Sequence, residues 1–332
     1  MSDLDRRQLL TATAALGVAS FDATRVWAQD ASKVAPDLTG QSILITGTSS
    51  GFGRLSAEHF ARLGATVFAS MRNVPRDEAR ELEALADKDG LDITVVEIDV
   101  LSDKQVKRGV QKVLNATGGT LDVLVNNAGI GITGPIELQD MEATQLAFDT
   151  NVFGPQRMTR AVLPAMRKQG SGHIVNISSQ LGRVILPTAG NYSPTKFALE
   201  AASEQYAYEL APQGIGVTII QPGGYPTDIW KNRNRYNTML KTRSPKSRLE
   251  AYPQAVARMG QEDGSGRSAD PMDIPHAIAD VLSEPMDQRP LRVAVHPGNK
   301  PQVKINEVSA QTQIAMLGGR NPTVKAVNLR GT

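Results

Sequence analysis

The sequence predicts a single α/β domain: a doubly wound, seven-stranded parallel sheet covered by helices on both faces, in three layers. Two observations lead to this fold class. From Thr39 onward, short runs of branched apolar residues alternate with stretches of helical periodicity, as expected for βαβ units. The first apolar run is followed by a glycine-rich turn and a helical pattern, which is the opening of a Rossmann-type dinucleotide fold.

Seven apolar runs are the candidate strands. Most are continuously apolar rather than alternating, as Ile43-Leu44-Ile45 illustrates, and this is typical of strands buried on both faces of a parallel sheet. The runs are Ser42 to Thr46, Thr66 to Ser70, Ile93 to Glu97, Val123 to Val125, His173 to Ile177, Val217 to Ile220 and Leu291 to Val295.

The stretches between these runs have one apolar face at helical spacing. They are Arg54 to Leu63, Asp77 to Lys88, Asp103 to Ala116, Glu142 to Met166 and Ser193 to Leu210. Residues 36–300 therefore form one domain. Within it, residues 223–270 have no clear periodicity and are expected to form a lid over a site, although short helices in it cannot be placed. The tail, residues 301–332, carries a helical pattern at Val303 to Leu317.

The composition excludes several kinds of chemistry. The 332 residues include no cysteine, so the chain forms no disulfide, thiolate metal site or cysteine nucleophile. The four histidines do not have metal-ligand spacing, and we predict no metal. The net charge of +2 comes without a concentrated basic cluster, so we expect no nucleic-acid partner.

The first 35 residues have the layout of an export signal of the twin-arginine type. Arg6-Arg7 precedes a weakly apolar run from Thr11 to Phe21, and Ala28 stands before a polar stretch. The run is shorter than the roughly 20 residues that span a bilayer, so no stable membrane insertion is expected. These features favour a periplasmic protein; a cytoplasmic protein with an N-terminal extension is the alternative.

The first strand leads into Thr46-Gly47-Thr48-Ser49-Ser50-Gly51-Phe52-Gly53, directly before a helix. Glycines allow a tight turn and close backbone approach, and a helix N-terminus offers free N–H groups to a diphosphate. Glycine turns also occur without any ligand, but this position between the first strand and the first helix favours a dinucleotide site.

The second strand ends at Met71-Arg72, where an enzyme that selects NAD has an acid. An arginine at this place pairs with the 2′-phosphate of NADP. We therefore predict NADP(H) as the cofactor, with NAD as the alternative. The less favoured alternative is that Arg72 is a solvated surface arginine after a strand.

Tyr192 and Lys196 are four residues apart and would share one face of a helix. A tyrosine has a pKa of about 10, and a neighbouring ammonium group is expected to lower it towards neutrality. Pro194 lies between the two residues and fits only a first helical turn, so Tyr192 is predicted at the helix start.

Taken together, these motifs resemble the short, single-domain branch of the short-chain dehydrogenase/reductase family, over roughly Thr39 to Val295. The resemblance implies a catalytic group consisting of Asn151, Ser179, Tyr192 and Lys196. It implies a cofactor site consisting of Gly47, Ser49, Ser50, Gly51, Phe52, Gly53, Arg72, Asp99, Val100, Asn127, Ala128, Gly129, Tyr192, Lys196, Pro222, Gly223 and Thr227.

The resemblance also implies roles. Tyr192 would be the general acid/base on the substrate oxygen, and Lys196 would also hold the nicotinamide ribose hydroxyls. Ser179 would hydrogen-bond the same substrate oxygen, and Asn151 would bind a water that links Lys196 to solvent. The expected activity is hydride transfer between NADP(H) and a small alcohol or carbonyl substrate, with a homodimer or homotetramer as the expected assembly.

Two other functions remain open from the sequence. One is an epimerase or dehydratase with tightly bound NAD, against which the glycine spacing and the missing acid at Met71 argue. The other is a catalytically silent NADP-binding sensor, which would be expected to lack one of the four catalytic residues. The substrate is also open, because the lid aromatics and bases fit either a site or a solvated surface. They are Tyr225, Trp230, Tyr236, Tyr252, Lys231, Arg233, Arg235, Lys241 and Arg243.

Overall fold

The computed structural model describes residues 35–329. The chain divides into two units, Met1–Ala35 and Pro36–Thr332, and only the second is described below. The expected export signal, with Arg6-Arg7 and Ala28, lies outside the described residues.

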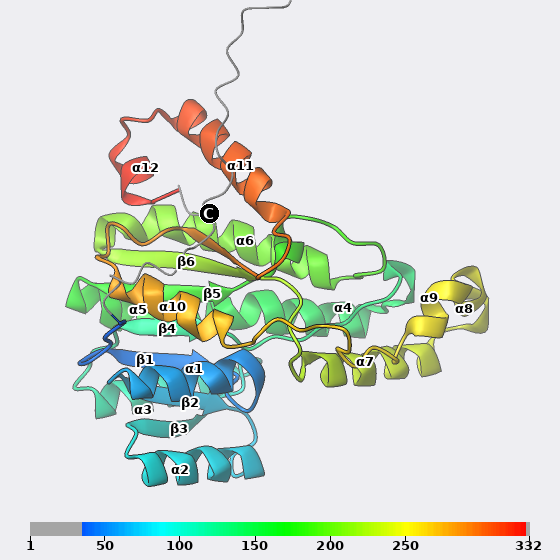
Figure 1. Ribbon diagram of the computed structural model, residues 1–332, viewed down its shortest axis with the longest axis horizontal. Helices are drawn as coiled ribbons and strands as arrows, with labels where there is room; N and C mark the ends of the chain where they lie inside the picture. The colour runs from blue at the N-terminus through cyan, green and yellow to red at the C-terminus, as the bar shows by residue number, and fades with distance from the viewer. Residues whose placement is uncertain (1–34, 330–332) are drawn as a thin grey trace, which may run out of the picture. The chain divides into compact units, whose positions relative to one another are not determined.

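A seven-stranded parallel sheet forms the centre of the described domain, in the order β3-β2-β1-β4-β5-β6-β7 (Figure 1). The predicted fold class is therefore confirmed. Each predicted apolar run contributes a strand, and the bounds differ by two residues at most. The strands are β1 Ser42–Thr46, β2 Thr66–Met71, β3 Ile93–Glu97, β4 Val123–Asn126, β5 Gly172–Ile177, β6 Ile215–Pro222 and β7 Arg292–Val295.

The pleat of the strands divides the core into two layers. Ile43 and Ile45 face one layer, while Leu44 between them faces the other, because successive side chains of a strand point to opposite faces. The layer of Ile43 and Ile45 contains α1 Gly51–Arg62, α2 Asp77–Asp89 and α10 Asp273–Ser283. The layer of Leu44 contains α3 Asp103–Ala116, α5 Gly154–Gln169 and α6 Tyr192–Leu210.

The single helix predicted from Glu142 to Met166 is wrong. The structure has α4 Met141–Phe148 and α5, joined by a π-helical turn at Asp149–Phe153. Pro155, in the first turn of α5, has no N–H and cannot form a regular bond to the carbonyl four residues earlier, which favours the wider turn. The turn contains the predicted catalytic residue Asn151.

The lid, residues 223–270, is more ordered than the sequence predicts. It contains α7 Ile229–Arg243, α8 Lys246–Ala251 and α9 Pro253–Arg258, which lie together beyond one end of the sheet (Figure 1). Leu240 and Met259 pack with Ile132 and Ala147 in a third apolar cluster. Only two residues of α7 are buried, so its periodicity is too weak to recognise in the sequence. The predicted C-terminal helix is present as α11 Gln302–Leu317, followed by α12 Pro322–Ala326.

A buried ion network attaches α6 to the sheet. Glu200 of α6 is 1% exposed, and its Oε2 lies 2.8 Å from Nε of Arg292 on β7. Its Oε1 accepts a hydrogen bond from Gln221 Nε2 of β6 at 2.9 Å. Arg292 also contacts Glu204, one turn further along α6, at 2.6 Å. Arg292 thus neutralises two carboxylates of the same helix, and these ion pairs hold α6 in place on the sheet.

Arg292→Met is expected to lower the free energy of unfolding by about 3–5 kcal/mol, because it leaves a buried carboxylate without its cation. Urea denaturation measures this value. The control is Arg62→Met, which removes a more exposed pair with Asp89 and should cost less than about 1 kcal/mol. Equal effects of the two substitutions would contradict the structural role of the network.

Candidate active site

A cleft of about 1010 Å³ opens at the carboxyl ends of β1 and β4. The strand order reverses between these two strands, and in doubly wound sheets such a point is where ligands bind. The cleft brings together all the predicted site residues except Gly53 and Asn151.

The ends of β1 and β4 are joined by polar contacts. Asn127 Nδ2 donates to the carbonyl oxygens of Thr46 (2.9 Å) and Gly47 (3.0 Å). Thr46 Oγ1 accepts from the backbone N–H groups of Asn127 and Ala128, each at 3.0 Å. These contacts hold the segment after β4 against the turn that follows β1.

Two glycines allow the turn between β1 and α1 to close. Gly47 has φ of 72°, and a Cβ there would lie 2.8 Å from the Ala128 Cα. At Gly53, a Cβ would lie 2.3 Å from the Gly47 carbonyl oxygen. Gly53 thus serves the packing of the turn and does not line the cleft.

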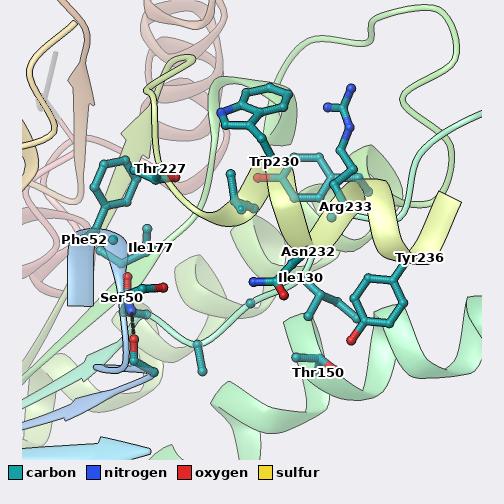
Figure 2. A pocket seen from close by; sticks show the side chains of 18 of the residues that line it. Ser50, Phe52, Ile130, Thr150, Ile177, Thr227, Trp230, Asn232, Arg233 and Tyr236 are labelled. Atoms are coloured by element: carbon teal, nitrogen blue, oxygen red, sulfur yellow. Dashed lines mark hydrogen bonds between the residues drawn. The ribbon is translucent and has the colours of Figure 1, made fainter. Parts of the chain in front are cut away.

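The N-terminus of α1 faces the cleft, lined there by Ser49, Ser50, Gly51 and Phe52. Figure 2 shows Ser50 and Phe52 across from Thr227 and the side chains of α7. Ser50, the N-cap residue, makes no side-chain capping bond, and the first turn contains no acid. The free N–H groups of such a helix end suit an anion. This part of the cleft fits a diphosphate.

Arginines line the cleft after β2. Both carboxylate oxygens of Glu78 bind Arg76, at 2.7 and 2.6 Å, and this hydrogen bonding lowers the pKa of Glu78 to about 2. Arg80 pairs with Asp77. Within residues 35–329, no carboxylate pairs with Arg72, so its guanidinium group is available to a ligand.

Tyr192 is the first residue of α6, as Pro194 predicts, and Lys196 follows one turn later. Lys196 Nζ donates to the Ile177 carbonyl at 2.8 Å and lies 5.7 Å from the centre of the Tyr192 ring. Ser179, just beyond β5, accepts from the Leu181 N–H at 3.1 Å, and its side chain hydrogen-bonds Tyr192. Three of the four predicted catalytic residues therefore meet in the cleft.

Burial dominates the titration of these groups. It raises the pKa of Tyr192, while the hydrogen bond with Ser179 and the charge of Arg233 act in the opposite direction. The lowered pKa that the sequence predicts for Tyr192 is therefore wrong, because desolvation of the phenolate outweighs the nearby positive charge. Burial also lowers the pKa of Lys196 to about 8, against the opposing effect of Glu200.

Asn151 lies behind the cleft rather than in its wall. Its Oδ1 accepts from the Ile130 N–H at 2.8 Å, and its Nδ2 donates to the Ile130 carbonyl at 2.9 Å and to Thr195 Oγ1 at 3.0 Å. Asn151 thus connects the segment after β4 to the first turn of α6. The water-binding role implied by the family stays a prediction.

The lid supplies one wall of the cleft, through Trp230, Arg233, Tyr236 and Arg267 (Figure 2). The sequence singles out the first three, but it cannot separate them from Tyr252, which does not line the cleft. Tyr225 borders the cleft from the core, is 2% exposed, and has its hydroxyl bound to Asp273. Tyr252 binds Glu137 instead. Arg267 and Glu262, also in the wall, follow α9 in a stretch without any periodic signal.

Within residues 35–329, no group of three histidine, aspartate or glutamate side chains is placed to hold a metal ion. No helix in this part of the chain has the length and apolar character needed to span a bilayer.

Comparison with known proteins identifies the fold and the kind of enzyme. Residues 41–238 match the family model described as short chain dehydrogenase. The 3-ketodihydrosphingosine reductase of Bacteroides thetaiotaomicron is 39% identical over 194 residues, which are 58% of this chain and 67% of that protein.

Two solved structures are similar and contain a nicotinamide cofactor. A short-chain dehydrogenase/reductase from Burkholderia phymatum in complex with NAD is 25% identical, with a TM-score of 0.66, over 86% of this chain and 97% of its own. A gluconate 5-dehydrogenase from Burkholderia cenocepacia, in complex with NADP and tartrate, is 25% identical with a TM-score of 0.59, over 75% and 89%. With its motifs, sheet and cleft, the chain belongs to the short-chain dehydrogenase family of oxidoreductases.

Proposed function

We propose that this protein transfers a hydride between NADP(H) and a carbonyl or alcohol substrate, with Tyr192 as the general acid/base. The observation that carries the proposal is the meeting of Tyr192, Ser179 and Lys196 in the cleft that also contains the N-terminus of α1. The ketone reductase named among the relatives supports a carbonyl substrate.

The cleft residues fit a nicotinamide dinucleotide. The uncapped N-terminus of α1 would hold the diphosphate, and Asp99 with Val100 would border the adenine. Pro222, Gly223 and Thr227, at the end of β6, would meet the nicotinamide amide. When bound, the cofactor supplies or accepts the hydride. Lys196 would bind the ribose hydroxyls through its ammonium group.

The proton chemistry belongs to the chain itself. Burial raises the pKa of Tyr192, so at neutral pH its phenol would be in the protonated form that donates a proton to the substrate oxygen during carbonyl reduction. Ser179 would hydrogen-bond the same oxygen and so keep it within reach of the Tyr192 hydroxyl. Ionisation of Tyr192 leaves a phenolate that the charges of Lys196 and Arg233 stabilise.

The preference for NADP(H) rests on Arg72. Of the three arginines that line the cleft after β2, Arg76 and Arg80 are engaged by Glu78 and Asp77. Arg72 therefore provides the guanidinium group for a 2′-phosphate, and Met71 provides no opposing charge.

We propose a homodimer or homotetramer as the assembly. The segments that carry Asn151 and Tyr192 each expose an aromatic side chain, Phe153 and Phe197. Exposed aromatic side chains on neighbouring elements are typical of subunit interfaces.

We also propose that the chain is exported in the folded state, with its cofactor bound, and cleaved after Ala28. The support is the fit between Arg6-Arg7, before a weakly apolar run, and an enzyme whose cofactor is made in the cytoplasm.

Tyr192→Phe is expected to retain NADPH binding and to lose about 10²–10⁴-fold in turnover, because it removes only the exchangeable proton. The measurement is NADPH oxidation with a panel of ketones and aldehydes, alongside NADPH binding. Tyr252→Phe, which removes a hydroxyl outside the cleft, should keep normal activity. Near-normal turnover in Tyr192→Phe would refute the assignment.

Combining Met71→Asp with Arg72→Gln should shift cofactor preference towards NADH. We expect KM for NADPH to rise about 10- to 100-fold, since the phosphate loses a charged partner and meets a carboxylate. Arg108→Gln, which breaks an exposed pair with Glu97, is the control and should leave the preference unchanged. A wild-type enzyme that already prefers NADH would contradict the role of Arg72.

Export predicts that native protein is found in the periplasmic fraction and begins after Ala28. The Arg6→Lys, Arg7→Lys variant should stay in the cytoplasm and begin near Met1, because paired arginines are the recognised feature. Cell fractionation with N-terminal sequencing tests both statements. Wild-type protein that is wholly cytoplasmic and uncleaved would overturn the proposal.

A further inference from the structure

Two arginines and a tryptophan form a rigid group in the lid wall of the cleft. The guanidinium carbons of Arg267 and Arg233 lie 3.6 and 4.5 Å from the centre of the Trp230 ring. The indole Nε1 donates to the Tyr225 carbonyl at 2.7 Å, which fixes the plane of the ring. Trp230 and Arg233 lie on the same side of α7 (Figure 2). Cation–π contacts on a fixed ring hold both guanidinium groups in place.

The group has an excess of one positive charge. Glu262 pairs with Arg233 and lies 3.8 Å from Arg267, so two cations share one carboxylate. The Arg233 side chain is 17% exposed, whereas that of Glu262 is 43% exposed. Arg233 Nε is fully buried and, among the residues that the structure describes, has no hydrogen-bond partner. Burying a charged group without full hydrogen bonding is costly, so an anion bound in the cleft would stabilise the Arg233 guanidinium group.

Arg233 also faces the reacting centre. Both Arg233 and Tyr192 line the cleft, and the charge of Arg233 opposes the rise that burial causes in the pKa of Tyr192. A substrate that meets Tyr192 with its carbonyl would therefore have Arg233 in the same cleft as a partner for a second, anionic group.

We propose that the substrate is an oxo acid and that Arg233 binds its carboxylate; this inference rests on the proposed function. A planar carboxylate matches the N–H groups of a guanidinium group, and its single negative charge matches the excess positive charge of the arginine–tryptophan group. Trp230 would contact the apolar part of the substrate. Glu262 occupies Arg233 from the exposed side and competes with the substrate carboxylate for it.

The test compares 2-, 3- and 4-oxo acids with their methyl esters, which keep the same carbonyl. We expect the wild type to prefer one acid over its ester by about 10- to 100-fold in kcat/KM, as for hydrogen bonds to charged groups. Arg233→Met should abolish the preference, mainly through KM. Any effect of Arg233 on Tyr192 itself changes kcat/KM for the acid and for the ester alike, so it cancels in the ratio of the two values.

Two variants make the comparison specific. Lys231→Met removes a charge from the same helix at a side chain that is 81% exposed and outside the cleft, and it should keep the preference. Glu262→Gln should increase kcat/KM for the acid, because a competitor is removed. A wild-type enzyme that prefers no acid over its ester would overturn the proposal. An Arg233→Met variant in which kcat/KM falls equally for the acid and the ester would also overturn it.

A binding measurement separates this proposal from the proposed catalytic function. The chain has two tryptophans, so in a Trp27→Phe background the fluorescence reports Trp230 alone. The acid should change the emission saturably, its ester should not, and Arg233→Met should remove the change. Saturable binding of the acid without NADPH oxidation would refute the oxidoreductase proposal but support the carboxylate site. NADPH oxidation with neutral ketones, without a fluorescence change on adding any acid, would support the oxidoreductase proposal and refute the carboxylate site.

Discussion

The carboxylate of Glu200 is the group on which the position of α6, the helix of Tyr192 and Lys196, depends. It lies on α6 one turn after Lys196, and it binds Gln221 of β6 and Arg292 of β7 in the interior. A buried carboxylate is tolerated only with such partners, so the helix cannot slide along the sheet without breaking them. Tyr192 and Lys196 are on the same helix, and their places at the carboxyl end of the sheet follow from this anchor. Its charge also favours the ammonium form of Lys196.

The cleft joins a region that presents backbone groups and a region that presents side chains. At the turn between β1 and α1, the chain offers backbone N–H groups, and Gly47 and Gly53 let neighbouring segments approach closely. At the start of α6, the chain offers side chains instead, and burial shifts the pKa of Tyr192 upward and that of Lys196 downward. Both shifts favour the uncharged forms. The cations around Tyr192 reduce the energy needed to form its phenolate, which a buried tyrosine alone would resist.

Much of this arrangement could be predicted from the sequence, because local patterns carry it. The continuous apolar runs correspond to the strands, and Pro194 correctly indicates that Tyr192 begins a helix. The errors have physical reasons. Pro155 interrupts a run that has helical periodicity throughout, and α7 buries too few residues to be recognised. The direction of the Tyr192 shift depends on the amount of protein packed around the phenol, and spacing between residues does not report it. Contacts such as that between Arg267 and Trp230 join distant segments and have no local signal.

The helices of the lid pack on a third apolar cluster, in which Leu240 and Met259 meet Ile132 and Ala147. Only the two ends of the lid, at Tyr225 and Ala269, join a cluster that flanks the sheet. Substitutions in the lid helices therefore need compensation mainly among neighbours of the third cluster, away from the strands that border the cleft. Such a division lets descendants of one ancestral scaffold acquire new substrates by drift in a few dozen residues, while the sheet and its cleft are inherited unchanged.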